Sequence, residues 1–482
     1  MSISGALTNA VSGLTASSRM AEIVSSNLSN ALTDGYGRRA VELSAAQLGG
    51  KGAGVQIDGI IRSTNPGLLA DRRLADAVLT GQQRHTESLT RLEESLGGVD
   101  GAASLTARFS AFERALISAS SDPASQLRLT EAVSRLSDLT ATLQAATRST
   151  QSSRQQADAA IARDVDRLNT GLRQVADLNK DIQHVTFSGK DASALLDARQ
   201  KAIDQIATIV PLREVPRDAG AVALITTTGV TLLDGRPVEF GFVQTTTIVA
   251  DMTLESGALS GLTFGNMLIN PTDGIGRLGG GSLGASFALR DDTLVGVQAG
   301  LDQIAVDLMT RFQDSTNDPT LIAGNPGLLT DQTNPLNMTD ITGLAGRIAV
   351  NAAIDQSKGG NPGLLRDGLN ATAPGPSGNS DQLNRWLGAL SELRHDVTDS
   401  GARSAAARIA DFTASIGAKR LSAEESVSLT AARWDSLRQA ELADGVNTDV
   451  ELQRLLRIEQ AYAANSKVLQ TVNAMMQRLL EI

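Results

Sequence analysis

A glycine-rich stretch in the second half of the chain contains two patterns that other proteins use for chemistry. Gly274, Gly276 and Gly279 have the G-x-G-x-x-G spacing of a dinucleotide-binding turn, in which backbone amides approach a pyrophosphate. Such a turn belongs to a unit of two parallel strands joined by a helix. The residues that follow predict a long helix without a returning strand, so we interpret the glycines as ordinary turns and expect no cofactor.

The second pattern overlaps the first. The segment from Gly280 to Gly284 places Ser282 in the G-x-S-x-G form of a hydrolase nucleophile elbow, and His395 follows later in the chain, as a hydrolase requires. An elbow serine comes directly after a strand, whereas residues 270–279 are loop-like. We therefore expect Ser282 to be the N-cap of the next helix, and keep a serine hydrolase using Ser282 only as a remote alternative.

Other residue types that carry chemistry are scarce. The chain has no cysteine and three histidines (His85, His184 and His395), which lie far apart in the sequence. Thiol chemistry and imidazole-rich metal sites are therefore disfavoured. We expect no catalytic, cofactor-binding or metal-binding residue, and hence no enzyme.

Charge and hydropathy disfavour two further classes of partner. The formal net charge is −10 and aromatic residues make up 3% of the sequence, so we expect no nucleic-acid-binding surface. No apolar run approaches the roughly 18 residues of a membrane span, so we expect no membrane insertion. The first basic residue is Arg19, so the positively charged start of a secretory signal is missing, and any export would use another route.

The clearest structural pattern lies at the two ends of the chain. Near the N-terminus, apolar and small residues recur at alternating spacings of four and three, which is a heptad seam with one polar member, Ser17. The other members are Ile3, Leu7, Ala10, Leu14, Ala21, Val24, Leu28 and Ala31. A second seam near the C-terminus consists of Leu455, Ile458, Tyr462, Asn465, Leu469, Val472, Met476 and Leu479.

Local signals support a helix for the C-terminal seam. Thr448 and Glu451 have the T-x-x-E spacing of a capping box, in which each side chain bonds the other residue's backbone amide. A helix over residues 449–480 would be about 45 Å long. Within it, Asn465 would fix the register of the pairing at some cost in stability.

The two seams are open to two interpretations. They are typical of ordinary core helices or of a dimer zipper. Coiled coils usually place charged residues beside the seam, however, and here Ser, Thr, Asn and Ala occupy the outer faces. Such faces suit close contact with further copies of the chain. We therefore favour an assembly role in which the terminal helices become ordered as they pack together and against neighbouring copies.

The whole sequence predicts a mainly α fold with a small β insertion. Residues 68–210, the segment after Gly284 and residues 382–443 are helical in pattern; residues 212–277 are β-rich, with Thr245 to Ala250 as one predicted strand; and residues 314–381 are irregular. We expect three domains: a coiled-coil-like terminal assembly domain (1–60 and 445–482), a middle domain of long helices (61–211 and 280–444) and an outer β-rich domain (212–279).

Several segments resemble one protein family. The segment from Ser25 to Arg39 resembles the N-terminal signature of the axial proteins of the bacterial flagellum, which form its rod, hook and hook-filament junction. Residues 445–447, 455–465 and 468–471 resemble the C-terminal signature of this family. Residues 195–199 and 280–284 are similar to blocks of the junction proteins and not of the hook. The signature residues near the N-terminus are Asn27, Asn30, Gly35 and Tyr36.

This resemblance implies a structural protein that passes unfolded through the flagellar type III export channel and assembles outside the cell. It would form a ring or helical tube of copies at the hook-filament junction and contribute to motility. The implied partners are the hook protein, hook-associated protein 3 and an export chaperone that covers the C-terminal seam as a helix in a groove. A hook or distal rod protein is the alternative within the family, and the helical middle region argues against it.

Overall fold

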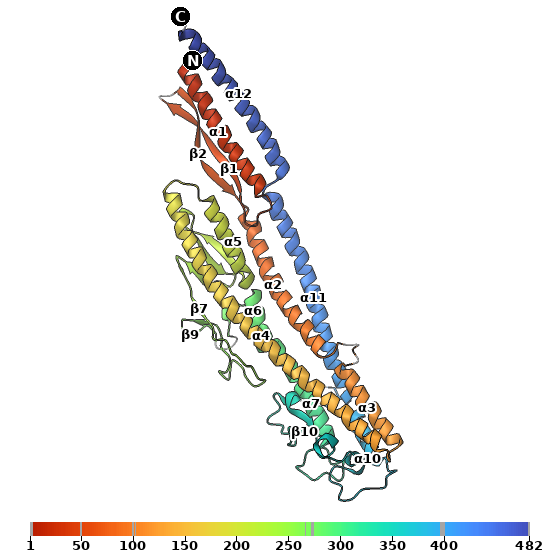
Figure 1. Cartoon of the computed structure of the whole chain (residues 1–482). Helices are drawn as coiled ribbons and strands as arrows, with labels where there is room; N and C mark the ends of the chain where they lie inside the picture. The colour runs from red at the N-terminus through yellow and green to blue at the C-terminus, as the bar shows by residue number, and fades with distance from the viewer. Residues whose placement is uncertain are drawn as a thin grey trace.

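The computed structural model describes residues 3–48, 51–98, 101, 103–265, 267–270, 274–395 and 401–480. They form an elongated molecule in which the first and last helices lie side by side at one end (Figure 1). From there the chain runs to the opposite end and returns. The expected fold class, mainly α with a small β insertion, is confirmed.

Helices make up most of the described chain. They are α1 (Ile3–Ser29), α2 (Pro66–Ser95), α3 (Leu105–Ser121), α4 (Gln126–Phe187), α5 (Ser193–Ile209), α6 (Gly281–Ala288), α7 (Leu294–Phe312), α8 (Leu344–Arg347), α9 (Leu364–Asp367), α10 (Asp381–Ser391), α11 (Ala405–Asp444) and α12 (Thr448–Leu480). Within the described residues, none of these helices has the length and apolar character needed to cross a membrane.

The strands form small antiparallel sheets. They are β1 (Arg38–Leu48), β2 (Lys51–Ser63), β3 (Leu212–Pro216), β4 (Val222–Thr226), β5 (Thr231–Asp234), β6 (Arg236–Pro237), β7 (Phe240–Gly241), β8 (Thr263–Phe264), β9 (Met267–Leu268), β10 (Leu329–Asp331) and β11 (Ile348–Val350). The largest sheet has the order β3-β4-β5-β6, and a second has the order β7-β8-β9.

A β-hairpin connects α1 to α2, although the sequence analysis assigned residues 1–60 to a helical domain. Strands β1 and β2 pair from Arg38 opposite Ser63, with irregularities in register after Glu42 and after Ala45. The hairpin lies along α1 (Figure 1). A two-stranded sheet is marginal by itself, so the helix provides the surface on which it is stable.

The far end of the molecule contains the larger core, built around the first half of α4. Leu136, Leu139 and Leu143 of this helix are buried against α3 and α7. The ring of Phe312 contacts those of Phe112 and Trp386 edge to face, with centroids 6.2 Å and 5.6 Å apart. Leucines at helical spacing thus find all of their partners within one molecule.

The second half of α4 belongs to another core. Its buried residues, including Leu168, Leu172 and Val175, pack against α5 and the sheet β3-β4-β5-β6. The predicted strand from Thr245 to Ala250 is wrong. The amide of Thr245 donates to Asp158 Oδ2 of α4 (2.7 Å), and Gln155 donates to the carbonyl of Thr246, so α4 side chains occupy groups that a strand ladder would use.

Candidate functional site

The predicted terminal seams meet where α1 and α12 lie side by side (Figure 1). On α1, Ala10 and Val24 are buried. The half-buried members of the N-terminal seam are Ile3, Leu7, Leu14, Ala21, Leu28 and Ala31. On α12, Ile458 and Val472 are buried. The half-buried members of the C-terminal seam are Leu455, Asn465 and Leu469.

The remaining members of the C-terminal seam are not covered in one molecule. Tyr462, Met476 and Leu479 are 47%, 42% and 60% exposed. They belong to a larger set of exposed apolar side chains on α12, which we call the α12 ridge. Its members are Val450, Leu452, Leu456, Tyr462, Val468, Met475, Met476, Leu479 and Leu480. A concentration of exposed, large apolar side chains on one helix is typical of an interaction site.

Gly13 and Asn465 mark a close approach of the two terminal helices. A Cβ atom placed on Gly13 would lie 2.7 Å from Nδ2 of Asn465. Any larger residue at position 13 would therefore push the amide away. This fit between a glycine and one amide side chain supports the expectation that Asn465 fixes the register of the pair.

The start of α12 differs from the predicted capping box. The cap is Asn447, whose Oδ1 accepts hydrogen bonds from the amides of Asp449 (3.0 Å) and Val450 (3.2 Å). Glu451 instead points into the molecule and is fully buried. Its carboxylate accepts from Nε of Arg38 (2.8 Å) and from Nδ2 of Asn27 (3.1 Å). A residue expected to close its own helix end thus connects α12 to α1 and the hairpin.

Asn27 is the centre of the signature segment and is fully buried. Its amide pairs with the backbone of Arg39 in both directions, donating to the carbonyl (2.9 Å) and accepting from the N–H (3.0 Å). Oδ1 also accepts from the hydroxyl of Tyr36 (2.9 Å). With the bond to Glu451, both donors and both acceptor positions of the amide are used. Only an asparagine side chain supplies this set at this length.

The other signature residues shape the turn after α1. Asn30 Nδ2 donates to the carbonyl of Ser26 (2.9 Å) and closes the end of the helix. Gly35 has a φ of +80°, a conformation that favours glycine. The ring of Tyr36 lies under the guanidinium of Arg39, 4.9 Å from ring centroid to Cζ. The signature therefore specifies one loop conformation.

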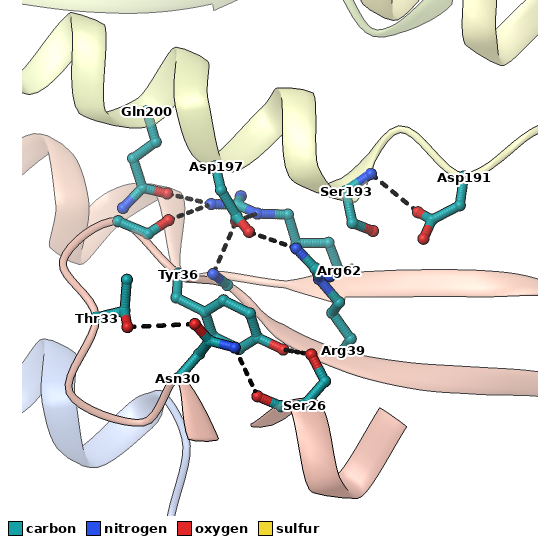
Figure 2. A network of polar contacts seen from close by, with 12 residues as sticks. Ser26, Asn30, Thr33, Tyr36, Arg39, Arg62, Asp191, Ser193, Asp197 and Gln200 are labelled. Carbon is teal, nitrogen blue, oxygen red and sulfur yellow. Dashed lines mark hydrogen bonds and ion pairs between the residues drawn. The ribbon is translucent and has the colours of Figure 1, made fainter. Parts of the chain in front are cut away.

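Asp197 of α5 anchors this loop and the hairpin to the rest of the molecule. Figure 2 shows its carboxylate between Arg39 and Arg62, with distances of 2.7 Å to Nη2 of Arg39 and 2.7 Å to Nε of Arg62. The amide of Gly37 donates to the same carboxylate (2.9 Å). Sequence reasoning singled out the block that contains Asp197 but gave it no role. No local signal could have shown that it contacts residues more than 130 positions away.

A group of ion pairs lies where α2, α5 and α11 meet, beside the loop that Asp197 anchors. Arg72 of α2 contacts Asp76 (2.7 Å), Asp204 (2.7 Å) and Glu441 of α11 (2.6 Å). Burial raises the pKa of Asp76 and of Glu441, and the charge of Arg72 offsets this only in part. We call this group, with the loop of residues 30–37, the joint. Trp434 and the joint line an open cavity of about 340 Å³.

Ser282 and the glycines before it are structural. The helix begins at Gly281 with Gly280 as the cap, so the prediction that Ser282 is the N-cap is wrong. The hydroxyl of Ser282 is buried and donates to Oδ2 of Asp164 (2.7 Å). No histidine is among its partners in the described residues, and no group of three or more His, Asp or Glu side chains there is placed to hold a metal ion. Gly281 packs against the backbone of Ile209, which leaves no space for a Cβ atom.

Comparisons with known proteins match the whole chain. A family model described as the flagellar hook-associated protein FlgK helical domain matches residues 89–328. Another, described as the flagellar basal body rod FlgEFG protein C-terminal, matches residues 443–482. The chain is similar to flagellar hook-associated protein 1 of Escherichia coli (strain K12), at 24% identity over 559 residues, and of Salmonella typhimurium, at 23% over 564 residues; both matches cover 100% of each chain.

A solved structure is also similar to part of the chain. It is that of the flagellar hook junction protein FlgK from Burkholderia pseudomallei, with a TM-score of 0.44 and 18% identity. The match covers 57% of this chain and 49% of that one, which is about half of the solved structure.

Proposed function

Because the chain belongs to the family of flagellar hook-associated protein 1, the structural protein of the hook-filament junction, we propose that its copies assemble there through α1 and α12. The observation that carries this proposal is the α12 ridge. A single molecule covers one side of α12 with α1 and leaves large apolar side chains such as Leu456 and Leu479 exposed.

The outer face of α1 is the complementary half of this contact. Most exposed positions of this helix carry small polar residues such as Ser4, Asn9 and Ser18; Val11 is an exposed apolar side chain, and Arg19 and Glu22 form an exposed ion pair. Small side chains permit close approach of a second helix. The ridge of one copy would therefore pack beside α1 of the next copy, and not against another ridge.

A contact between two different surfaces has a geometric consequence. It is heterologous, so repetition produces a ring or a helical tube and not a closed dimer. We infer that the terminal helices are fully ordered only in this assembly, because each isolated molecule leaves the ridge in water. On this proposal the terminal assembly domain, the middle domain and the β-rich outer domain keep the boundaries expected from the sequence.

The finer roles are part of the same proposal. The chain is exported through the type III channel and is extracellular when assembled. Its neighbours are the hook protein on one side and hook-associated protein 3 on the other. Before export, a chaperone covers the C-terminal seam in the helix-in-groove mode. The family is a structural one, and the buried position of Ser282 supports no catalytic role.

The direct test replaces two residues of the α12 ridge that are exposed in the single molecule. We expect Leu456→Ser with Leu479→Ser to abolish swimming and to release unpolymerised flagellin into the medium. The matched control is Leu127→Ser, which removes an even more exposed leucine (81%, against 59% for Leu456 and 60% for Leu479) from α4 at the far end and should leave motility intact. The double variant should still be found in the medium and show a normal helical circular dichroism spectrum. Normal swimming by this variant would contradict the proposal.

A further inference from the structure

A second cavity lies beside the joint, on the other side of Gln200. Its volume is about 370 Å³, which is within the range of small-molecule sites. The end of β2, the first turns of α2, the helix α5 and the strand β3 enclose it. It therefore lies between the hairpin, which belongs to the terminal region, and the core of the second half of α4.

Apolar residues make up half of the residues that line the cavity. Leu69 and Leu196 line the cavity from two different helices, α2 and α5. Ile203 and Leu212 also line it and are buried. A wall of this kind favours a ligand with an aliphatic body.

Arginines provide the polar part of the wall. Arg62, Arg73, Arg199 and Arg213 all line the cavity, whereas Glu214 is the one carboxylate among its described lining residues. Arg62 is held by Asp197, and Arg73 is held by Asp204 and Glu214. These two arginines are therefore already neutralised by partners.

Arg199 and Arg213 are not neutralised in this way. Arg199 is 8% exposed, and Nη1 donates to Oδ1 of Asn179 (3.0 Å) and to the carbonyl of Gly220 (2.6 Å), both of which are uncharged. Burial lowers the pKa of Arg199, an effect that Glu214 opposes and that Arg62 and Arg73 increase. Arg213 is exposed, and its guanidinium makes no hydrogen bond or ion pair within the described part of the chain.

We propose that this cavity binds a small aliphatic carboxylate. Its carboxylate would pair with Arg199 and Arg213, for which the planar guanidinium fork is well suited. Its short apolar chain would pack between Leu69 and Leu196. Bound there, the ligand contacts β2, α2, α5 and β3 together and stabilises the attachment of the hairpin to the body.

The test uses the full-length chain and 4-methylpentanoate as the probe. We expect saturable binding in isothermal titration and a rise in the thermal midpoint, with acetate and inorganic phosphate much weaker at equal ionic strength. Arg213→Gln should weaken binding about tenfold, through the loss of one charge-assisted pair. Leu196→Gln should weaken binding of 4-methylpentanoate and leave the weak binding of acetate unchanged.

Arg236→Gln is the matched control. Arg236 is also exposed and lies in β6, at the opposite edge of the same sheet as Arg213 in β3. Its replacement should leave the affinity unchanged. The proposal is overturned if no saturable binding occurs, if Arg236→Gln weakens binding as much as Arg213→Gln, or if phosphate binds as tightly as 4-methylpentanoate.

Discussion

The first half of α4 and the helix α12 are both long, and they differ in how much of their apolar surface one molecule covers. On α4, Leu136, Leu139 and Leu143 are completely buried. On α12, Ile458 and Val472 are the buried apolar residues, and Leu456 and Leu479 remain exposed. Helical periodicity alone therefore does not show whether the partner of a helix lies in the same molecule or in a neighbouring one.

The two regions also differ in the kind of contact that fixes them. The far end is held by interlocked leucine and aromatic side chains. The terminal region depends on polar contacts: those of Asp197 with Arg39 and Arg62 attach it to the body, and those of Glu451 with Arg38 and Asn27 hold α12 to α1 and the hairpin. Such contacts depend on direction and specify one arrangement, although their net contribution to stability is modest.

The largest expected effect comes from a leucine in the far core. Leu136→Ala should lower the free energy of unfolding by about 3 kcal/mol, because the site is fully buried and a cavity remains. Leu456→Ala on α12 should change it by less than about 0.5 kcal/mol. Urea denaturation followed by circular dichroism measures both. Equal losses in the two variants would remove the distinction between these helices.

The second effect tests the centre of the signature loop. Asn27→Ala should destabilise the terminal region by about 2 kcal/mol, since the backbone of Arg39 and the carboxylate of Glu451 lose buried partners. Hydrogen exchange should then accelerate in residues 3–45 and 448–460 and stay unchanged in α4. The control Asn9→Ala, at an exposed position of α1, should exchange like the original chain. Uniform acceleration throughout the chain would count against a local role for Asn27.

The third prediction concerns the buried carboxylate of Glu451. Glu451→Gln should cost about 1 kcal/mol, because Arg38 loses its counter-charge but remains partly in contact with water. Protease cleavage near residues 445–450 should become faster. Glu459→Gln, at an exposed site on the same helix, serves as the control and should not alter the cleavage rate. If both variants behave alike, the contact of Glu451 with Arg38 has no part in holding α12.

The smallest effect is a pH dependence of opposite sign in the two regions. The pKa values of Asp76 and Glu441 are raised in the folded protein. The stability that these carboxyls contribute to the joint is therefore fully present below their ordinary pKa values of 3.8 and 4.5, and it is lost as the pH rises through the raised pKa values. The joint, with Arg72, Arg73, Asp204 and Arg438 around these carboxyls, should therefore become less stable as the pH rises from about 4 to 7. In the far loops, the Thr316 hydroxyl lowers the pKa of Asp314, so its contribution is lost as the pH falls below about 3.8.

The fluorescence of Trp434 tests the pH dependence predicted for the joint. With Trp386→Phe, it becomes the single tryptophan of the chain, and its fluorescence gives a urea midpoint for the joint at each pH. Adding Asp76→Asn and Glu441→Gln should abolish the difference between about pH 4 and pH 7. An unchanged difference in that variant would assign the effect to other groups.

The sequence predicted those features that depend on neighbouring residues. The seams from Ile3 and from Leu455 correctly predicted two terminal helices, because a heptad repeat is visible within one segment. The mainly α fold with its β insertion was predicted on the same basis. The hairpin of β1 and β2 was missed, since β2 contains three glycines and both strands are stabilised by α1.

The polar core of the site could not be predicted, because its partners are distant in the chain. Glu451 and Asn27 lie 424 positions apart, and the local T-x-x-E spacing indicated a capping box in place of their contact. The pattern around Ser282 likewise indicated a local role as a helix N-cap, whereas its hydroxyl bonds Asp164, 118 positions away. Residue spacing predicts only contacts between residues that are close in the sequence. The contacts of Glu451 with Asn27 and of Ser282 with Asp164 form only in the complete fold.

The pairing of α1 with α12 also has a consequence for the order in which the molecule folds. Residues 30–447 lie between the two helices in the chain. The helix α1 therefore has no partner helix until nearly the whole polypeptide is available for folding. The far end can begin to form earlier, because α3 and α4 are consecutive in the chain, although its core is completed only by residues up to Ile416. The terminal pair should therefore be the last part to form, late enough for another protein to capture α1 or α12 first.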